Sequence, residues 1–201
     1  SSDVCSSDLV KTPIKESSLL EGKLHPTNEA YAIAKIAGIK LCEAIYNQYK
    51  LDLVAIMPTN LYGPNDRYDK VFSHVIPAML LKFINAKKKK LKYVEIWGDG
   101  TPLREFLYSD DLAEAIYLIL KSSQKKLIKI SGNKFPLINI GGSDIYSIRD
   151  LAYLIKSKIG YQGSIYFNKD FPNGVLKKDL DSSRIKKLGW RPNINLSSGL
   201  D

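Results

Sequence analysis

The sequence is short of several residue types and patterns, and each shortage excludes a class of protein. Two cysteines among 201 residues, Cys5 and Cys42, are too few for a disulfide framework, so we expect a reducing compartment, the cytoplasm. No apolar run is long enough to span a bilayer, and the first residues lack the charged-then-apolar pattern of a signal peptide. We therefore predict no membrane partner.

Acidic residues are scarce relative to basic ones, since 21 Asp and Glu stand against 30 Lys and Arg and give a net charge of +9. Much of the excess lies in lysine pairs and in the run of lysines at 87–90. Neither a basic stretch interleaved with aromatics nor a nucleic-acid-binding motif accompanies them. We interpret these lysines as solvated surface and predict no nucleic-acid partner, while a positive surface would suit a diphosphate-bearing substrate.

One glycine pattern is also absent. A dinucleotide-binding fold opens with a strand, a Gly-x-Gly-x-x-Gly turn and a helix whose N-terminus holds the pyrophosphate. The pairs Gly141-Gly142 and Gly98-x-Gly100 lack that spacing and context. The composition is otherwise ordinary for a globular protein, with 44% hydrophobic and 25% charged residues, and the length allows a sizeable core.

What the sequence does contain is a Tyr-x-x-x-Lys pair, Tyr31 and Lys35, after the helix-start signal at 25–28. Residues four apart share a helix face, and an ammonium beside a phenol favours the phenolate, which suits proton transfer. Apolar residues on more than one face of the segment 31–46 predict a helix buried on two sides. The pair alone is a weak signal, because a core tyrosine beside a surface lysine has the same spacing.

The next segments predict alternating strands and helices. Residues 51–57 are typical of a buried parallel strand, and Pro58 to Leu61 follow at its carboxyl end, where open α/β sheets bind ligands. Further strands are predicted at 93–97, 106–108, 137–140 and 165–167, and helices at 71–86, 112–120 (capped by Asp110 or Asp111), 147–159 and 182–188. Residues 121–134 are predicted to form an exposed loop, in which 127–130 could be a short strand.

The segment 25–46 resembles the active-site helix of extended short-chain dehydrogenase/reductases that act on sugar nucleotides, with the GDP-L-fucose synthases as the nearest family. Three more segments resemble that family in order and spacing, at 57–64, 73–78 and 97–106. The resemblance implies an α/β fold: the second half of a doubly wound, Rossmann-like parallel sheet over 10–64, and a smaller mixed α/β substrate domain over 65–201 with segments returning to the first.

The resemblance fails at residues 1–9, where the family has Ser-Ser-Cys and then Tyr-Pro. We interpret this stretch as a non-native scar, and Cys5, one place off the family's cysteine, is a weak catalytic candidate. Because the glycine turn is missing too, we expect the chain to be a C-terminal piece of a longer enzyme.

For that longer enzyme, the resemblance implies NADP(H)-dependent 3,5-epimerisation and 4-reduction of GDP-4-keto-6-deoxy-D-mannose to GDP-L-fucose. Tyr31 would protonate the carbonyl oxygen, Lys35 would hold the nicotinamide ribose, and His74 would be an acid/base of epimerisation. The cofactor would contact Tyr31, Lys35, His74, Pro58, Thr59, Asn60 and Leu61, and the GDP-sugar would contact Lys82, Trp97 and Arg104. A homodimer through the Tyr31 helix is also implied, and no metal site.

Two alternatives stay open. The first is another sugar-nucleotide enzyme of the superfamily, a 4,6-dehydratase or 4-epimerase, which shares Tyr-x-x-x-Lys but is not expected to carry the Ser-His-Val-Ile-Pro segment at 73–77. The second is a non-catalytic fragment that binds a partner or nucleic acid through its lysines.

Overall fold

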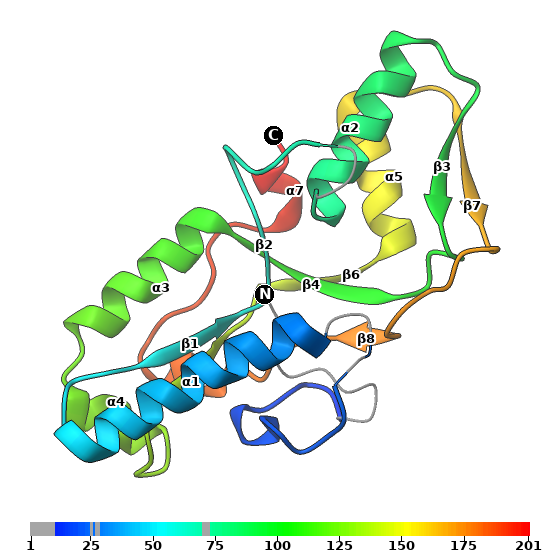
Figure 1. Cartoon of the computed structure of the whole chain (residues 1–201). Coiled ribbons are helices and arrows are strands. Elements are labelled where there is room, and N and C mark those ends of the chain that lie inside the picture. The colour runs from blue at the N-terminus through cyan, green and yellow to red at the C-terminus, as the bar shows by residue number, and fades with distance from the viewer. Residues whose placement is uncertain (1–10, 25, 27–28, 70–72) are drawn as a thin grey trace.

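The computed structural model describes residues 11–24, 26, 29–69 and 73–201 (Figure 1). Helices and strands alternate along much of the chain, which confirms the predicted α/β class. Its helices are α1 (Glu29–Tyr49), α2 (Val75–Lys88), α3 (Ser109–Lys121), α4 (Gln124–Ile130), α5 (Ile148–Ile159), α6 (Ser183–Lys187) and α7 (Leu196–Gly199), with a 3-10 turn at Glu16–Ser18. Its strands are β1 (Ala55–Pro58), β2 (Asn60–Tyr62), β3 (Tyr93–Trp97), β4 (Leu103–Tyr108), β5 (Leu137–Ile140), β6 (Asp144–Ser147), β7 (Ser164–Asn168) and β8 (Lys177–Lys178).

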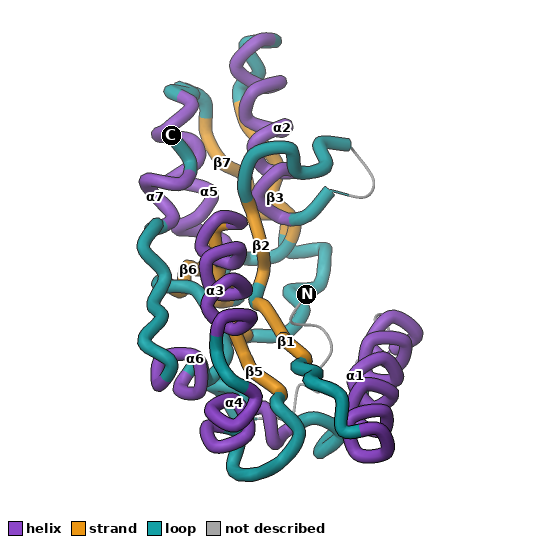
Figure 2. The backbone as a smooth tube through the Cα atoms, turned by 90° about the vertical axis from the view of Figure 1, so that its left-hand side faces the viewer, coloured by secondary structure: helices purple, strands orange, loops and turns teal. Residues whose placement is uncertain are grey.

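Parallel pairing dominates the sheets. Strand β1 pairs with β5, β2 with β4, β3 with β7 and β8 with β4, all parallel, whereas β6 pairs antiparallel with β4. Strands β1 and β2 follow one another along the same line, with a break at Thr59 (Figure 2). The pairing of β1 with β5 fixes the chain before that break, and the pairing of β2 with β4 fixes the chain after it.

Strand β4 lies between two hydrophobic cores. Successive side chains of a strand point to opposite faces. Phe106 accordingly packs in the core that contains Phe83 of α2 and Ile155 of α5, while Leu107 packs in the core that contains Ile138 of β5. Neighbouring residues of β4 thus pack against different halves of the fold.

Helix α1 contradicts the prediction of two buried faces. Of its described residues, Ala32 and Ile36 are buried, whereas Ile33 is 52% and Leu41 61% exposed. The helix lies at the edge of the molecule in Figure 2. Its second apolar face therefore has no cover among the described residues.

Several other predicted boundaries shift. Strand β1 begins at Ala55 rather than at residue 51, β4 extends back to Leu103, and α2 begins at Val75, with its predicted first turn partly outside the described residues. The predicted loop 121–134 is wrong, because 124–130 form α4, in which Ser123 caps the helix by accepting from the Lys126 N–H. The predicted α3 cap is also wrong, since Tyr108 holds that position.

The predicted elements β3, β5, β7, α5 and α6 are confirmed within a residue or two. No helix in the described part of the chain has the length and apolar character needed to cross a bilayer. Cys5 lies outside the described residues, and the division of the chain near residue 64 stays a prediction.

Candidate active site

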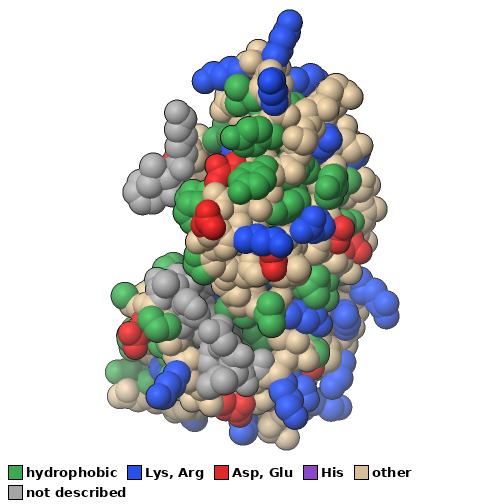
Figure 3. Space-filling view, turned by 90° about the vertical axis from the view of Figure 1, so that its right-hand side faces the viewer, with side chains coloured by type: hydrophobic (Ala, Val, Ile, Leu, Met, Phe, Trp, Pro, Cys, Tyr) green, Lys and Arg blue, Asp and Glu red, His purple; other side chains and the backbone are tan. Residues whose placement is uncertain are grey.

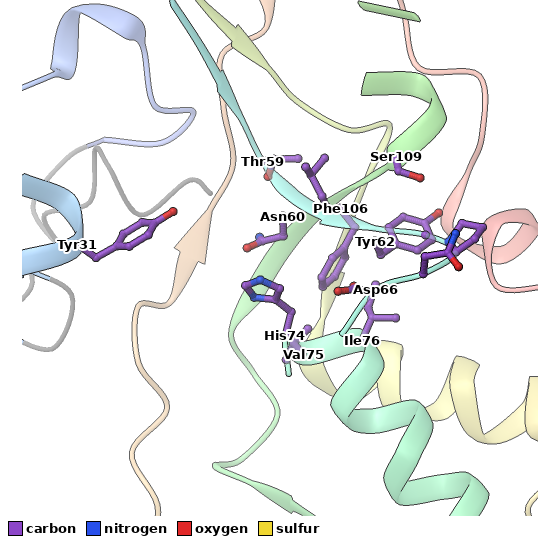
Figure 4. A pocket seen from close by; sticks show the side chains of 14 residues that line it. Tyr31, Thr59, Asn60, Tyr62, Asp66, His74, Val75, Ile76, Phe106 and Ser109 are labelled. Atoms are coloured by element: carbon purple, nitrogen blue, oxygen red, sulfur yellow. The ribbon is translucent and has the colours of Figure 1, made fainter. Parts of the chain in front are cut away.

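A cavity of about 730 Å³ opens where the carboxyl end of β1, the start of α2 and helix α1 face one another (Figure 4). Its lining comes from segments far apart in the sequence. It is lined by Tyr31, Thr59, Asn60, Leu61, Tyr62, Gly63, Pro64, Asn65, Asp66, His74, Val75, Ile76, Phe106 and Ser109. Five of the predicted site residues are thereby brought together, from α1, the β1–β2 segment and the α2 start.

Tyr31 reaches this cavity from α1. Its side chain is 44% exposed, and its hydroxyl points toward the side of the cavity formed by Thr59 and Asn60 (Figure 4). The Lys35 Nζ lies 5.5 Å from the centre of the Tyr31 ring, as expected for residues four apart on one helix face. Lys35 itself does not line the cavity, so the pair presents the phenol inward with a cation beside it.

The break between β1 and β2 is held firmly. Thr59 is 1% exposed, and its N–H donates to the Ile140 carbonyl at 3.0 Å. The Thr59 hydroxyl and the Asn60 side-chain amide both donate to the backbone carbonyl of Glu105, at 3.2 and 2.9 Å. Leu61 lines the cavity, whereas Pro58 completes β1 and does not.

His74 occupies the N-cap position of α2. Its backbone is extended, with ψ of 171°, and its carbonyl accepts from the Ala78 N–H at 2.9 Å, while its imidazole makes no capping hydrogen bond. The imidazole lies beside Asn60 in the cavity (Figure 4). An exposed imidazole near a polar wall can exchange a proton with a bound molecule.

Sequence reasoning missed part of the lining, namely Tyr62, Asp66, Phe106 and Ser109. Tyr62 comes from a segment already singled out for its likeness, but no spacing rule showed that it turns inward. Burial raises the pKa of Tyr62, and its hydroxyl lies 3.4 Å from the Asn195 carbonyl, so this phenol is a neutral structural donor. Tyr31 is therefore the better candidate for proton transfer.

The predicted substrate residues form a separate group outside this lining. Trp97, 61% exposed at the end of β3, stacks on Phe171 with ring centres 4.5 Å apart and an interplanar angle of 11°. Lys82 of α2 places its Nζ 5.2 Å from the Trp97 ring and donates to the Glu95 carbonyl at 3.0 Å. Burial lowers the Lys82 pKa, against the opposing charge of Glu95. Hydrophobic and basic side chains intermingle on this side of the molecule (Figure 3).

Arg104 lies on β4 and is tied to the same loop as Phe171. Its Nη1 donates to the carbonyls of Leu103 and Val175, at 2.8 and 2.7 Å. Nearby, the Asn173 Oδ1 accepts from the Asp99 N–H at 2.8 Å. Hydrogen bonds from Thr101 and Asn173 lower the pKa of Asp99 to about 2. The loop 169–176 therefore contacts the neighbourhood of both Trp97 and Arg104.

Comparison with known proteins extends these observations. GDP-L-fucose synthase of Escherichia coli K12 is 45% identical over 192 residues, which are 96% of this chain and 60% of that protein. A GDP-6-OMe-4-keto-L-xylo-heptose reductase from Campylobacter jejuni superposes with a TM-score of 0.89 at 34% identity, covering 98% of this chain and 66% of that one. A GDP-mannoheptose C4 reductase from C. jejuni with NADP bound superposes with a TM-score of 0.83 at 33% identity, covering 99% of this chain and 65% of that one.

The chain thus spans 60% of the length of the E. coli relative. The model of the NAD dependent epimerase/dehydratase family matches residues 1–141, well over half of the chain. That match includes α1 with its Tyr-x-x-x-Lys pair and the β1–β2 break that faces it. The chain therefore belongs to the NAD dependent epimerase/dehydratase family.

Proposed function

We propose that a protein carrying this chain converts GDP-4-keto-6-deoxy-D-mannose to GDP-L-fucose with NADPH, by epimerisation at carbons 3 and 5 and reduction at carbon 4. The observation that carries the proposal is that one cavity is lined by all four of Tyr31, Thr59, Asn60 and His74. The 45% identity to a GDP-L-fucose synthase supports the substrate class. The likeness to a reductase with NADP bound supports the cofactor.

The described residues fit the nicotinamide end of such a cofactor. The cavity follows the carboxyl end of β1, where parallel sheets bind nucleotides, and the Asn60 amide and the Tyr31 hydroxyl provide polar groups at its walls. Thr59, Asn60, Leu61 and Tyr31 would hold the nicotinamide and its ribose, together with Lys35. When bound, the reduced cofactor supplies the hydride for carbon 4.

Side chains of the protein donate and accept the protons of the reaction. As carbon 4 is reduced, Tyr31 gives its hydroxyl proton to the developing alkoxide, and Lys35, beside the ring, stabilises the phenolate left behind. The 4-keto group acidifies the hydrogens on carbons 3 and 5. His74 exchanges a proton at one of these carbons, because its imidazole lines the cavity and makes no capping hydrogen bond.

The second group of residues contacts the nucleotide in this proposal. Trp97 offers an aromatic face, and Lys82 and Arg104 offer positive charge for a diphosphate. The exposed second face of α1 supports the proposed homodimer through this helix, because Ile33 and Leu41 would gain cover there. We place the enzyme in the cytoplasm.

The test is a chimera that joins this chain to the part of the E. coli enzyme that it does not cover. We expect NADPH oxidation that depends on the keto sugar and yields GDP-L-fucose, measured by absorbance and by chromatography of the products. A folded chimera that binds NADPH but does not turn over this substrate would refute the assignment. The His74→Asn variant should give reduced but unepimerised sugar, which separates this activity from that of a 4-epimerase.

A further inference from the structure

Phe171 is an aromatic residue to which the proposed chemistry gives no task. It lies in the loop 169–176 after β7, and its side chain is 37% exposed. Its ring is nearly parallel to the ring of Trp97, with centres 4.5 Å apart and an interplanar angle of 11°. Trp97 ends β3 and is 61% exposed. Two stacked rings are thus left in contact with solvent at one point of the molecule.

Trp97 is flanked from both edges of β3. The Gly98 N–H donates to the last carbonyl of β7 at 2.8 Å. Backbone groups of neighbouring residues in a strand point to opposite edges, so the Glu95 carbonyl, three residues earlier, faces away from β7. That carbonyl accepts from the Lys82 Nζ, which also lies 5.2 Å from the centre of the Trp97 ring. Lys82 and Phe171 therefore approach the indole ring from opposite edges of the strand, and Phe171 is the aromatic member of the two.

Hydrogen bonds hold the loop that carries Phe171. Two residues further on, the Asn173 Oδ1 accepts from the Asp99 N–H at 2.8 Å. The Val175 carbonyl then accepts from the Arg104 Nη1 at 2.7 Å. The ring is thereby positioned before any ligand arrives, so a molecule that stacks on it loses little free energy in ordering the loop.

Positive charge lies close to the stacked pair. Lys82 contacts the Trp97 ring, and Arg104 contacts the loop that carries the second ring. The Asp99 carboxylate is also nearby, but it accepts from the N–H and the hydroxyl of Thr101, at 2.8 and 2.6 Å, and is engaged within its own turn. A flat aromatic surface beside two cations fits a ligand that joins a flat ring to phosphates, which is a nucleotide.

We propose that Phe171 is a further substrate-binding residue. The base of a purine nucleoside diphosphate stacks on the Trp97–Phe171 pair, and its phosphates lie toward Lys82 and Arg104. The identity of this nucleotide as GDP rests on the proposed function, whereas the stacking depends on the described residues alone. A purine has a larger ring surface than a pyrimidine, so the pair favours a purine nucleotide. Phe171 thus contributes to the choice of nucleotide.

Calorimetric titration of the chain with GDP, UDP and inorganic pyrophosphate tests the proposal. We expect GDP to bind more tightly than either of the others. Phe171→Leu should weaken GDP binding about 5- to 150-fold, which is the contribution of one base stacked on an aromatic side chain. It should leave pyrophosphate binding unchanged, because the phosphates contact Lys82 and Arg104. Phe171→Tyr keeps the ring and should keep the affinity for GDP.

Tyr166→Leu is the matched control. Tyr166 is an exposed aromatic residue of β7, 51% exposed, and it pairs edge to face with Tyr93, with ring centres 6.0 Å apart. This substitution should leave GDP binding unchanged, because the ring is not part of the stack with Trp97. An equal loss of GDP affinity in Tyr166→Leu and Phe171→Leu would contradict the assignment to Phe171.

The unsubstituted chain can overturn the proposal even if Phe171→Leu does not fold. Absence of GDP binding, or equal affinities for GDP and pyrophosphate, would mean that the base makes no contact. Tighter GDP binding in Phe171→Leu would mean that this ring blocks the base. GDP binding that depends on Phe171, in a chain whose chimera does not turn over, would keep the stacking role and reject the enzymatic assignment. Turnover by the chimera, with a GDP affinity that does not depend on Phe171, would do the reverse.

Discussion

The two walls of the cavity are built very differently. On the sheet side, Thr59 is 1% exposed and shares the Glu105 carbonyl with Asn60. On the helix side, Tyr31 stands on α1, which buries Ala32 and Ile36 among its described residues. One wall is thus fixed by hydrogen bonds to a central strand, and the other by a narrow apolar stripe. The chemistry assigned to Tyr31 therefore depends on the less firmly held wall.

The largest expected effect is on the helix side. In the chimera, Tyr31→Phe should lower kcat about 10²–10⁴-fold, because the phenol is the proton donor to the alkoxide and the ring itself is kept. NADPH affinity, measured by fluorescence titration, should change little. Turnover equal to that of the unsubstituted chimera would refute the role of Tyr31.

At the start of α2, His74→Asn should slow solvent-deuterium incorporation at carbon 3 or 5 by about 10²-fold, since an amide cannot exchange a proton as imidazole does. NMR or mass spectrometry of the recovered sugar measures this rate. Reduction should continue, because Tyr31 and Lys35 remain. Undiminished exchange at both carbons in a folded variant would leave His74 with a structural or cofactor-contacting role.

The buried carboxyl group on the sheet side predicts a pH effect on stability. The pKa of Glu105 rises from 4.5 to about 7 on folding, so its contribution is fully present below pH 4.5 and is lost as pH rises through 7. The lost contribution is about 3 kcal/mol, since each pKa unit corresponds to about 1.4 kcal/mol. Urea unfolding at several pH values should show this loss in the chain itself and not in Glu105→Gln. Parallel curves for the two proteins would contradict it.

The smallest effects compare the walls directly. Thr59→Val removes a buried hydroxyl that donates to Glu105 and should cost about 1–2 kcal/mol of unfolding free energy. Leu41→Ser on α1 should stay within about 0.5 kcal/mol, because Leu41 is 61% exposed. Urea titration of both variants provides the comparison. A loss for Leu41→Ser that grows with protein concentration would instead indicate that α1 is covered in a homodimer.

Local patterns predicted much of this fold. The strand at 137–140, the helix after Ser147 and the strand at 93–97 are confirmed, because each has a clear period and a turn or cap beside it. The prediction of a loop with a short strand at 124–130 is wrong. The apolar residues Leu127, Ile128 and Ile130 fit a short strand and a short helix alike, and the capping hydrogen bond to Ser123 stabilises the helix. The prediction that α1 is buried on two sides is wrong, because periodicity shows that a face is apolar and not that another element covers it.

The sequence by itself determined what lies within one helix or one turn. Tyr31 and Lys35 meet because four residues make about one turn of α1, whatever surrounds it. Tertiary structure alone decided that the Thr59 hydroxyl meets the carbonyl of Glu105, 46 residues away, and that Trp97 stacks on Phe171. The β1–β2 break lies beside Glu105 because β2 pairs with β4, and Phe171 follows β7, which pairs with β3. Strand pairing joins segments far apart in the chain, and no local period encodes which strands will pair.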